Sequence, residues 1–211
     1  MGKYIVEFIG TFFLVLTICM TVMGGLGNFA PIAIGFVLMV MIYGGGHVSG
    51  AHYNPAVTVS VFLRGKVSAA DVPGYIIAQC LAAFVAVFVA KALLTVLPLE
   101  AMAAAPVRDM TAVLLAEFLG TFALCWVILN VATAKATAGN SYFGLAIGCT
   151  VTACAYGLGP VSGGAFNPAV ALGVSYAGLS LWSQIWMYIV AQLVAAAAAA
   201  TVFKVTVEDQ S

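Results

Sequence analysis

Two copies of the tetrapeptide Asn-Pro-Ala-Val, at residues 54–57 and 167–170, are the part of this chain best suited to specific chemistry. Asparagine is a favoured helix N-cap and proline a favoured first helical residue, so a helix is predicted to begin at each copy. The Asn amide can donate a hydrogen bond, and the carbonyls of the glycine-bearing runs before each copy can accept one. The pattern indicates hydrogen bonding to a neutral molecule by two motifs: Asn54, Pro55, Ala56 and Asn167, Pro168, Ala169.

The composition places these motifs in a membrane. Of the 211 residues, 64% are hydrophobic and 7% are charged, whereas soluble domains carry about 25% charged residues. Seven Lys and Arg balance seven Asp and Glu, so no net charge favours nucleic acid. The five cysteines lie in apolar runs without Cys-x-x-Cys spacing, which indicates buried thiols rather than disulfides or a metal site.

Six apolar stretches are long enough to cross roughly 30 Å of hydrocarbon. Because lipid offers no partner for backbone polar groups, these stretches are predicted to be helices. The fold class is therefore an all-α membrane protein with six transmembrane helices and, at the Asn-Pro motifs, two re-entrant half-helices. The predicted spans cover about residues 4–25, 31–49, 71–97, 110–133, 141–159 and 181–205.

The two halves of the chain repeat one another. The segment Glu-Phe-Ile-Gly-Thr-Phe at 7–12 returns as Glu-Phe-Leu-Gly-Thr-Phe at 117–122, and Ala-Ile-Gly, Asn-Pro-Ala-Val and Tyr-Ile-x-Ala-Gln return at an offset of 113 residues. Each half, residues 1–100 and 108–211, holds three spans, so the second half enters the membrane from the opposite side. We expect one channel domain, residues 1–211, built as an inverted repeat about an axis in the membrane plane.

The helices after the two motifs are too short to cross a membrane. About ten apolar residues follow each Asn, at 55–64 and 168–177, which gives about 15 Å of helix, half the hydrocarbon core. The inversion brings the two N-termini together at the midplane. Each presents about half a positive charge there, which repels cations and protons.

The Lys and Arg residues near the span ends set the orientation. With the N-terminus inside, five of them are cytoplasmic, Arg108 is outside and Lys91 snorkels outward. This predicts a multi-pass protein of the cytoplasmic (plasma) membrane with both termini cytoplasmic. The five cytoplasmic residues are Lys3, Arg64, Lys66, Lys135 and Lys204.

The residues around the two motifs resemble a known family. Residues 49–58 read Ser-Gly-Ala-His-Tyr-Asn-Pro-Ala-Val-Thr and residues 166–169 read Phe-Asn-Pro-Ala, which is similar to the aquaporins and aquaglyceroporins, the major intrinsic proteins. The resemblance covers nearly the whole chain. It implies one pore per subunit, a homotetramer in lipid, and two buried carboxylates, Glu7 and Glu117, that hydrogen-bond the re-entrant loops.

The sequence departs from this family at the selectivity filter. The family usually has Arg directly after the second Asn-Pro-Ala, where this chain has Val170. By the resemblance, the other filter positions are Ile34, Ala155 and Gly164, whereas water-selective members carry an aromatic residue at the first and His at the second. We expect a wide, apolar, uncharged filter that passes water or larger neutral solutes. The Asp that often follows the Arg in glycerol facilitators is also absent, since Ala171 stands there.

Several solutes and functions stay open at this point. Glycerol, urea, ammonia, hydrogen peroxide, dissolved gases and undissociated metalloid acids all fit such a filter. A proton-coupled secondary transporter that uses Glu7 and Glu117 is one alternative, and a closed or structural homologue is another. His47 and His52 are expected at the inner vestibule rather than on a metal, because no third ligand lies nearby in the sequence. The chain is predicted to be no enzyme and to need no cofactor.

Overall fold

The computed structural model describes residues 1–97 and 104–207 of the chain, and within these ranges every regular element is helical. Six helices are long and apolar enough to cross a membrane. They are α1 (Gly2–Met23), α2 (Ala30–Ser49), α4 (Val72–Leu94), α5 (Met110–Thr133), α6 (Phe143–Ser162) and α8 (Ile185–Thr206). Two short helices, α3 (Pro55–Leu63) and α7 (Pro168–Ala177), lie between them in the chain order.

The predicted fold class is confirmed, with small shifts at the helix ends. The fifth span was expected to end at residue 159, before a proline, but α6 continues to Ser162. Pro160 sits in the last turn, and Gly163 ends the helix in a left-handed conformation (φ 93°) while donating its N–H to the Gly159 carbonyl. The predicted repeat ends at residues 100 and 211 lie outside the described residues.

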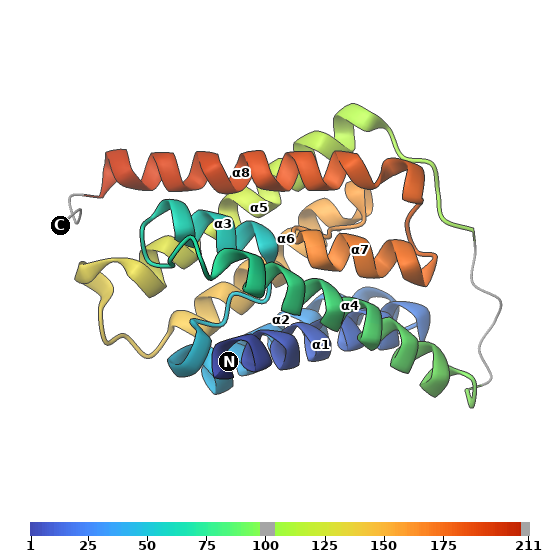
Figure 1. Cartoon of the computed structure of the whole chain (residues 1–211). Helices are drawn as coiled ribbons and strands as arrows, with labels where there is room; N and C mark the ends of the chain where they lie inside the picture. Colours follow the sequence, from blue (N-terminus) through green and yellow to red (C-terminus); the bar gives the residue numbers. More distant parts are fainter. Residues whose placement is uncertain (98–103, 208–211) are drawn as a thin grey trace.

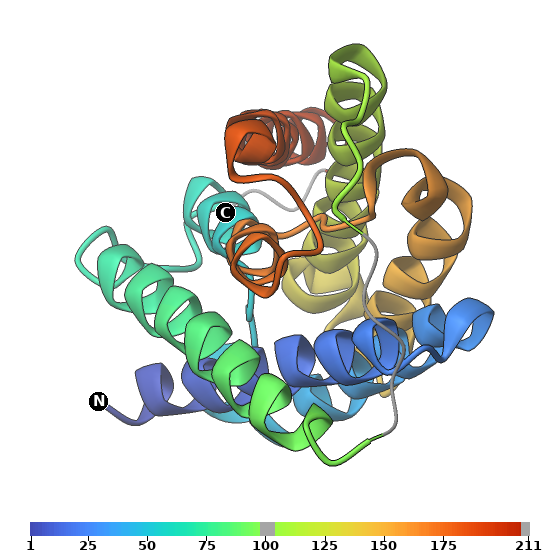
Figure 2. The same cartoon turned by 90° about the vertical axis from the view of Figure 1, so that its right-hand side faces the viewer.

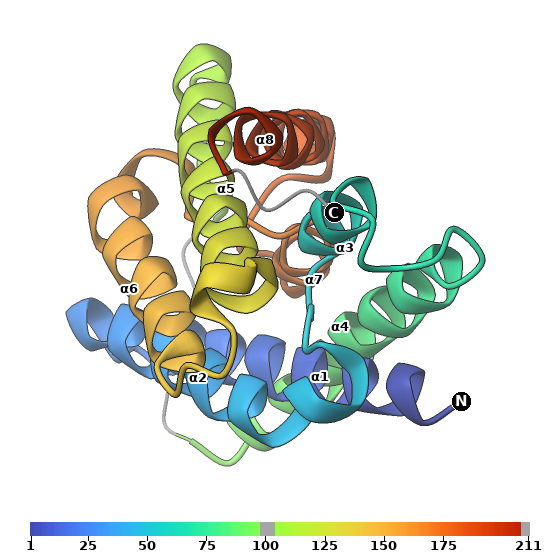
Figure 3. The same ribbon diagram turned by 90° about the vertical axis from the view of Figure 1, so that its left-hand side faces the viewer.

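The long helices surround the two short ones (Figure 3). Helix α7 packs on α4 and α3 packs on α8, so each half-helix fills a gap in the wall of the bundle. Figure 1 shows the N-terminal ends of α3 and α7 facing one another near the middle of the molecule. This arrangement is that of two re-entrant half-helices in an inverted repeat.

The ends of the bundle differ in what they carry. The start of α1 and the end of α8 lie at one end, and the end of α4 and the start of α5 lie at the other (Figure 1). Figure 2 looks onto this second end, where α7 is seen near the centre of the helices. The two ends therefore offer different residues to the mouths of any central path.

Each half-helix begins at an asparagine cap. The backbone of Asn54 is extended (φ −159°), and its Oδ1 accepts hydrogen bonds from the N–H groups of Ala56 at 2.8 Å and Val57 at 3.4 Å. Asn167 caps α7 in the same way, accepting from Ala169 at 2.9 Å and Val170 at 3.4 Å. These bonds satisfy donors that a buried helix start would otherwise leave unpaired.

The two halves are in close contact where α2 crosses α6. A Cβ added to Gly35 would lie 2.6 Å from the carbonyl oxygen of Gly148, and one added to Gly148 would lie 2.5 Å from that of Gly35. Helices without side chains at a crossing can approach until their backbones touch, which is a common way of packing in membranes. The crossing therefore depends on both glycines.

Gly148→Ala is expected to destabilise the folded protein by about 1–3 kcal/mol, because the added methyl meets backbone that cannot move aside. Gly157→Ala, on the same helix, is the control, because a Cβ there has no neighbour within 4 Å. Thermal unfolding in detergent should show a lower midpoint for the first variant and an unchanged or higher one for the second. Equal midpoints for the two variants would contradict a tight α2–α6 crossing.

Candidate functional site: two carboxylate-held loops around a central cavity

The loop before α3 is fixed by a carboxylate from α1. Glu7 is fully buried and accepts four hydrogen bonds. Its Oε1 accepts from the Ser49 hydroxyl (2.7 Å) and the His52 N–H (2.9 Å). Its Oε2 accepts from the Tyr53 N–H (2.6 Å) and the Gln79 amide (2.8 Å). Both oxygens are thus occupied by donors, which compensates for burying a charge.

The loop before α7 is held in the same way by Glu117, which is also fully buried. Its Oε1 accepts from the Ser162 hydroxyl at 2.6 Å and the Ala165 N–H at 3.0 Å. Its Oε2 accepts from the Phe166 N–H at 2.7 Å and the Gln192 amide at 2.8 Å. The internal repeat therefore extends to single hydrogen bonds.

Both loops hold unfavourable backbone conformations. Ala51 (φ 53°), Tyr53 (φ 51°) and Phe166 (φ 48°) have positive φ without being glycine. Each such residue costs on the order of 1–3 kcal/mol, and it persists only where its surroundings fix it. The carboxylate contacts to the N–H groups of Tyr53 and Phe166 are such surroundings.

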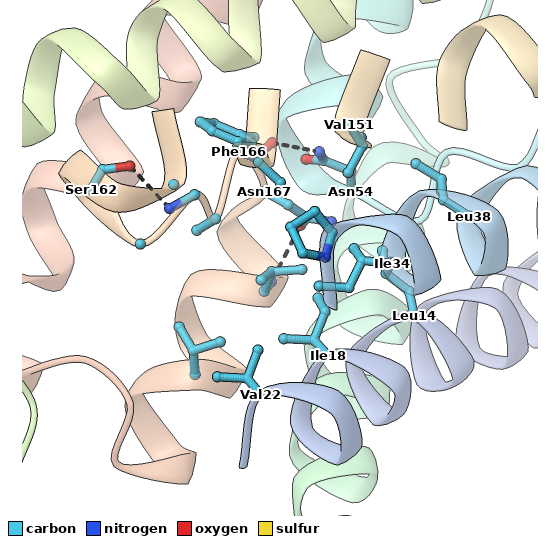
Figure 4. A pocket seen from close by; sticks show the side chains of 18 of the residues that line it. Leu14, Ile18, Val22, Ile34, Leu38, Asn54, Val151, Ser162, Phe166 and Asn167 are labelled. Carbon is cyan, nitrogen blue, oxygen red and sulfur yellow. Dashed lines mark hydrogen bonds between the residues drawn. The ribbon is translucent and has the colours of Figure 1, made fainter. Parts of the chain in front are cut away.

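The two loops also hold one another. Nδ2 of Asn54 donates to the Phe166 carbonyl at 2.9 Å, and Nδ2 of Asn167 donates to the Tyr53 carbonyl at 2.8 Å. An amide group has two N–H donors, so one N–H of each Asn remains for another acceptor. Both Asn side chains line a central cavity, in which Figure 4 shows them lying close together.

The cavity has a volume of about 500 Å³ and a mainly apolar lining. Its lining runs from residues 104–106 of the connection between the halves, past the two Asn residues, to Ile42 and Ile128. Figure 4 shows side chains of α1 and α2, such as Ile18 and Ile34, facing this space. The four positions singled out as a filter all line it: Ile34, Ala155, Gly164 and Val170.

The two histidines lie in different places. His52 is buried, lines the cavity and lies with Nδ1 3.1 Å from the Thr58 hydroxyl. His47 is exposed in the last turn of α2 and is absent from the cavity lining. Within the described residues, no group of three or more His, Cys, Asp or Glu side chains could hold a metal ion.

Several supporting residues received no role from the sequence. Gln79 and Gln192 complete the carboxylate contacts, and the hydroxyls of Tyr75 and Tyr188 donate to the carbonyls of Ser49 and Ser162. All four stand in the repeated Tyr-Ile-x-Ala-Gln segment. The repetition of polar residues inside apolar spans was the signal, because a polar side chain in hydrocarbon needs a partner.

The sequence matches the profile of the family described as Major intrinsic protein over residues 1–203. The chain belongs to this family. It is an integral, multi-pass membrane protein of the aquaporin and aquaglyceroporin kind, a channel for water and small solutes rather than an enzyme.

Relatives and a solved structure agree with this assignment. The chain is 36% identical over 195 residues to putative aquaporin NIP4-1 of Arabidopsis thaliana, with 89% of this chain and 68% of that protein covered. It is 37% identical over 207 residues to glycerol uptake facilitator protein-like 6 of Lactiplantibacillus plantarum, with 95% of each covered. The aquaglyceroporin from Plasmodium falciparum shares the fold, with a TM-score of 0.83, 22% identity, and 97% and 96% of the two chains covered.

Glu7→Gln is expected to lower the stability of the folded protein by about 2–6 kcal/mol, because an amide NH₂ faces two donors that each lose about 1–3 kcal/mol without an acceptor. Glu117→Gln should behave alike. Asp109→Asn is the matched control: its carboxylate caps α5 from an exposed position by accepting from Ala112, and Asn caps helices equally well. Thermal midpoints in detergent measure all three, and a control as unstable as the two Glu variants would contradict the role given to the buried carboxylates.

Proposed function

We propose that this chain is a passive channel for small neutral solutes with a wide, apolar filter at Ile34, Ala155, Gly164 and Val170. The observation that carries the proposal is the cavity, which these four residues line together with Asn54 and Asn167. Two of the four are Ala and Gly, and none is charged, so the filter offers little steric or electrostatic hindrance to a neutral molecule. Each Asn keeps one N–H for a solute oxygen.

Ions and protons are excluded, in this proposal, where the two half-helices meet. The N-termini of α3 and α7 face each other, their capping residues Asn54 and Asn167 line the cavity, and each N-terminus acts as about half a positive charge. The surrounding lining is mainly apolar, so a cation at this point would lose its hydration without gaining a counter-charge. Neutral molecules avoid both costs.

The solute range follows from the width and polarity of the filter. Water and glycerol are the first candidates, and the similarity to glycerol uptake facilitator protein-like 6 supports glycerol. Urea, ammonia, hydrogen peroxide, dissolved gases and undissociated metalloid acids are further neutral molecules for such a path. The buried Glu7 and Glu117 have donors on both oxygens, which disfavours the proton-coupled transporter. The open cavity disfavours a closed or structural role.

The same proposal includes the assembly and the orientation. Residues 1–211 act as one channel domain, and four copies form a homotetramer in the plasma membrane with both termini in the cytoplasm. The start of α1 and the end of α8 lie at the same end of the bundle, which supports placing both termini on one side of the membrane. A stripe of exposed apolar side chains on α4 is suited to lipid or to a neighbouring subunit: Ile77, Leu81, Val85 and Phe88.

The decisive experiment is stopped-flow light scattering on proteoliposomes that contain the purified protein. Water permeability and the uptake of glycerol, urea and ammonia are compared with empty vesicles, while a pH-sensitive dye reports proton leak. Rapid uptake of the neutral solutes without proton leak is the expected result. Well-folded protein without any flux would overturn the channel proposal, and water flux alone would overturn the wide filter.

Val170→Arg is expected to reduce glycerol and urea uptake about tenfold or more, which corresponds to about 1.4 kcal/mol of added barrier, while part of the water flux remains. Val170 is buried in the cavity wall, so the larger, charged side chain must enter the path. Val170→Ile adds apolar volume without charge and should have a smaller effect. An unchanged solute profile for Val170→Arg would place the filter elsewhere.

A further inference from the structure

The connection between the two halves brings a charged side chain to the cavity. Arg108 precedes α5, and among the described residues that line the cavity it alone carries a formal charge. Its guanidinium lies over the backbone of Gly163, where a Cβ would be 3.1 Å from Nη2. The neighbouring residue is Gly164, one of the four filter positions.

The guanidinium has unused hydrogen-bonding capacity. Nη1 of Arg108 is buried and makes no hydrogen bond in the described part of the chain, where no carboxylate forms an ion pair with it either. The hydroxyl of Ser180, which is 6% exposed and lines the same cavity, is also buried and without a partner. Buried polar groups are normally paired, so two groups without partners in the lining of one cavity favour a polar ligand in that cavity.

The backbone of Arg108 is fixed even though it belongs to a connecting segment. The buried Gln184 accepts from the Arg108 N–H at 3.3 Å and donates to its carbonyl at 2.8 Å. The next residue, Asp109, uses its carboxylate to cap α5 and is therefore engaged elsewhere. The Arg108 guanidinium therefore extends toward the cavity from a backbone that Gln184 holds in place.

A comparison of the two halves explains why the Arg108 guanidinium can lie against Gly163. In the first half, the ring of His52 lies against Gly50, with Nε2 3.3 Å from a Cβ placed there. The equivalent residues of the second half, 113 positions on, are Ala165 and Gly163. The small side chain at Ala165 leaves free the side of Gly163 that the guanidinium covers.

From these contacts we propose that Arg108 is a specificity-determining residue of the pore. Its guanidinium repels cations at the part of the cavity lined by residues 104–106 and 108, and it donates a hydrogen bond to the oxygen of a passing neutral solute. Ser180 offers a second hydrogen-bonding group to the same solute. The proposal rests on the channel function above and adds a charge that the four filter residues lack. The barrier to cations then has two parts, this guanidinium and the two half-helix N-termini.

The test compares variants in proteoliposomes with two readouts. A pH-sensitive dye under a clamped potential reports proton leak, and light scattering reports glycerol uptake in the same vesicles. Arg108→Ala and Arg108→Gln should raise proton leak about tenfold or more, the scale set by removing one charge a few ångströms from the path, whereas Arg108→Lys should stay near the wild type. Because Gln184 binds only main-chain atoms of Arg108, these substitutions leave the clamp in place.

Lys66→Ala is the matched control, since it removes one positive charge from an exposed position that is not part of the cavity lining. The double variant Arg108→Ala with Val170→Arg should return proton leak toward the wild-type level, because it restores a positive charge at the cavity wall. Gln184→Ala, which releases the backbone of Arg108, should give a smaller rise in leak. This variant tests whether the Arg108 guanidinium must be held in place, because it keeps the charge of Arg108 and removes only the contacts to its backbone.

The outcomes separate this inference from the channel function. Glycerol uptake by the wild type and the single variants, with proton leak raised in Arg108→Ala, Arg108→Gln and Gln184→Ala but not in Arg108→Lys or Lys66→Ala, supports it. Glycerol uptake with the same low leak in Arg108→Ala and Arg108→Gln as in the wild type overturns it and leaves the channel intact. A rise in Lys66→Ala as large as that in Arg108→Ala also overturns it. No glycerol or water flux in the wild type overturns the channel proposal itself.

Discussion

The structure depends on one constraint: irregular backbone cannot lie in hydrocarbon unless other protein groups satisfy it. The loops before α3 and α7 are irregular because a half-helix must start at the middle of the bundle. Glu7 and Glu117 answer this constraint by accepting two backbone N–H groups each. The nearby serines and glutamines donate to the same carboxylates, and the tyrosines donate to the serine carbonyls. The capped half-helices pack between α4 and α8.

The two halves are alike in what holds the loops and different in what faces the cavity. The carboxylate contacts are matched bond for bond. By contrast, the cavity-lining His52 of the first half corresponds to Ala165 in the second, 113 positions on. The inverted repeat thus gives a symmetric frame, and single substitutions on it make the two mouths of the cavity chemically unequal.

The fold could be predicted from the sequence because its signals are local. Length and hydropathy identify six spans, and Asn-Pro followed by ten apolar residues identifies a helix that cannot cross the membrane. The contact of Gly35 with Gly148 could not be read from the sequence, because it depends on α2 and α6 becoming neighbours. Gln79 and Gln192 were visible as repeated polar residues, but their partner depended on which helices become neighbours. The approach of Arg108 to the cavity could not be predicted, because this residue lies outside the spans and its backbone is held by Gln184, 76 residues away.

The exchange of hydrogen bonds between the two loops has a consequence for how the chain is made. Asn54 binds a carbonyl at Phe166, and Asn167 binds one at Tyr53. Synthesis runs from the N-terminus, so Asn54 is made before Phe166, and its half-helix cannot reach its final set of contacts until the second half has been added. A first half made alone therefore has an Asn54 amide that lacks its acceptor, the Phe166 carbonyl.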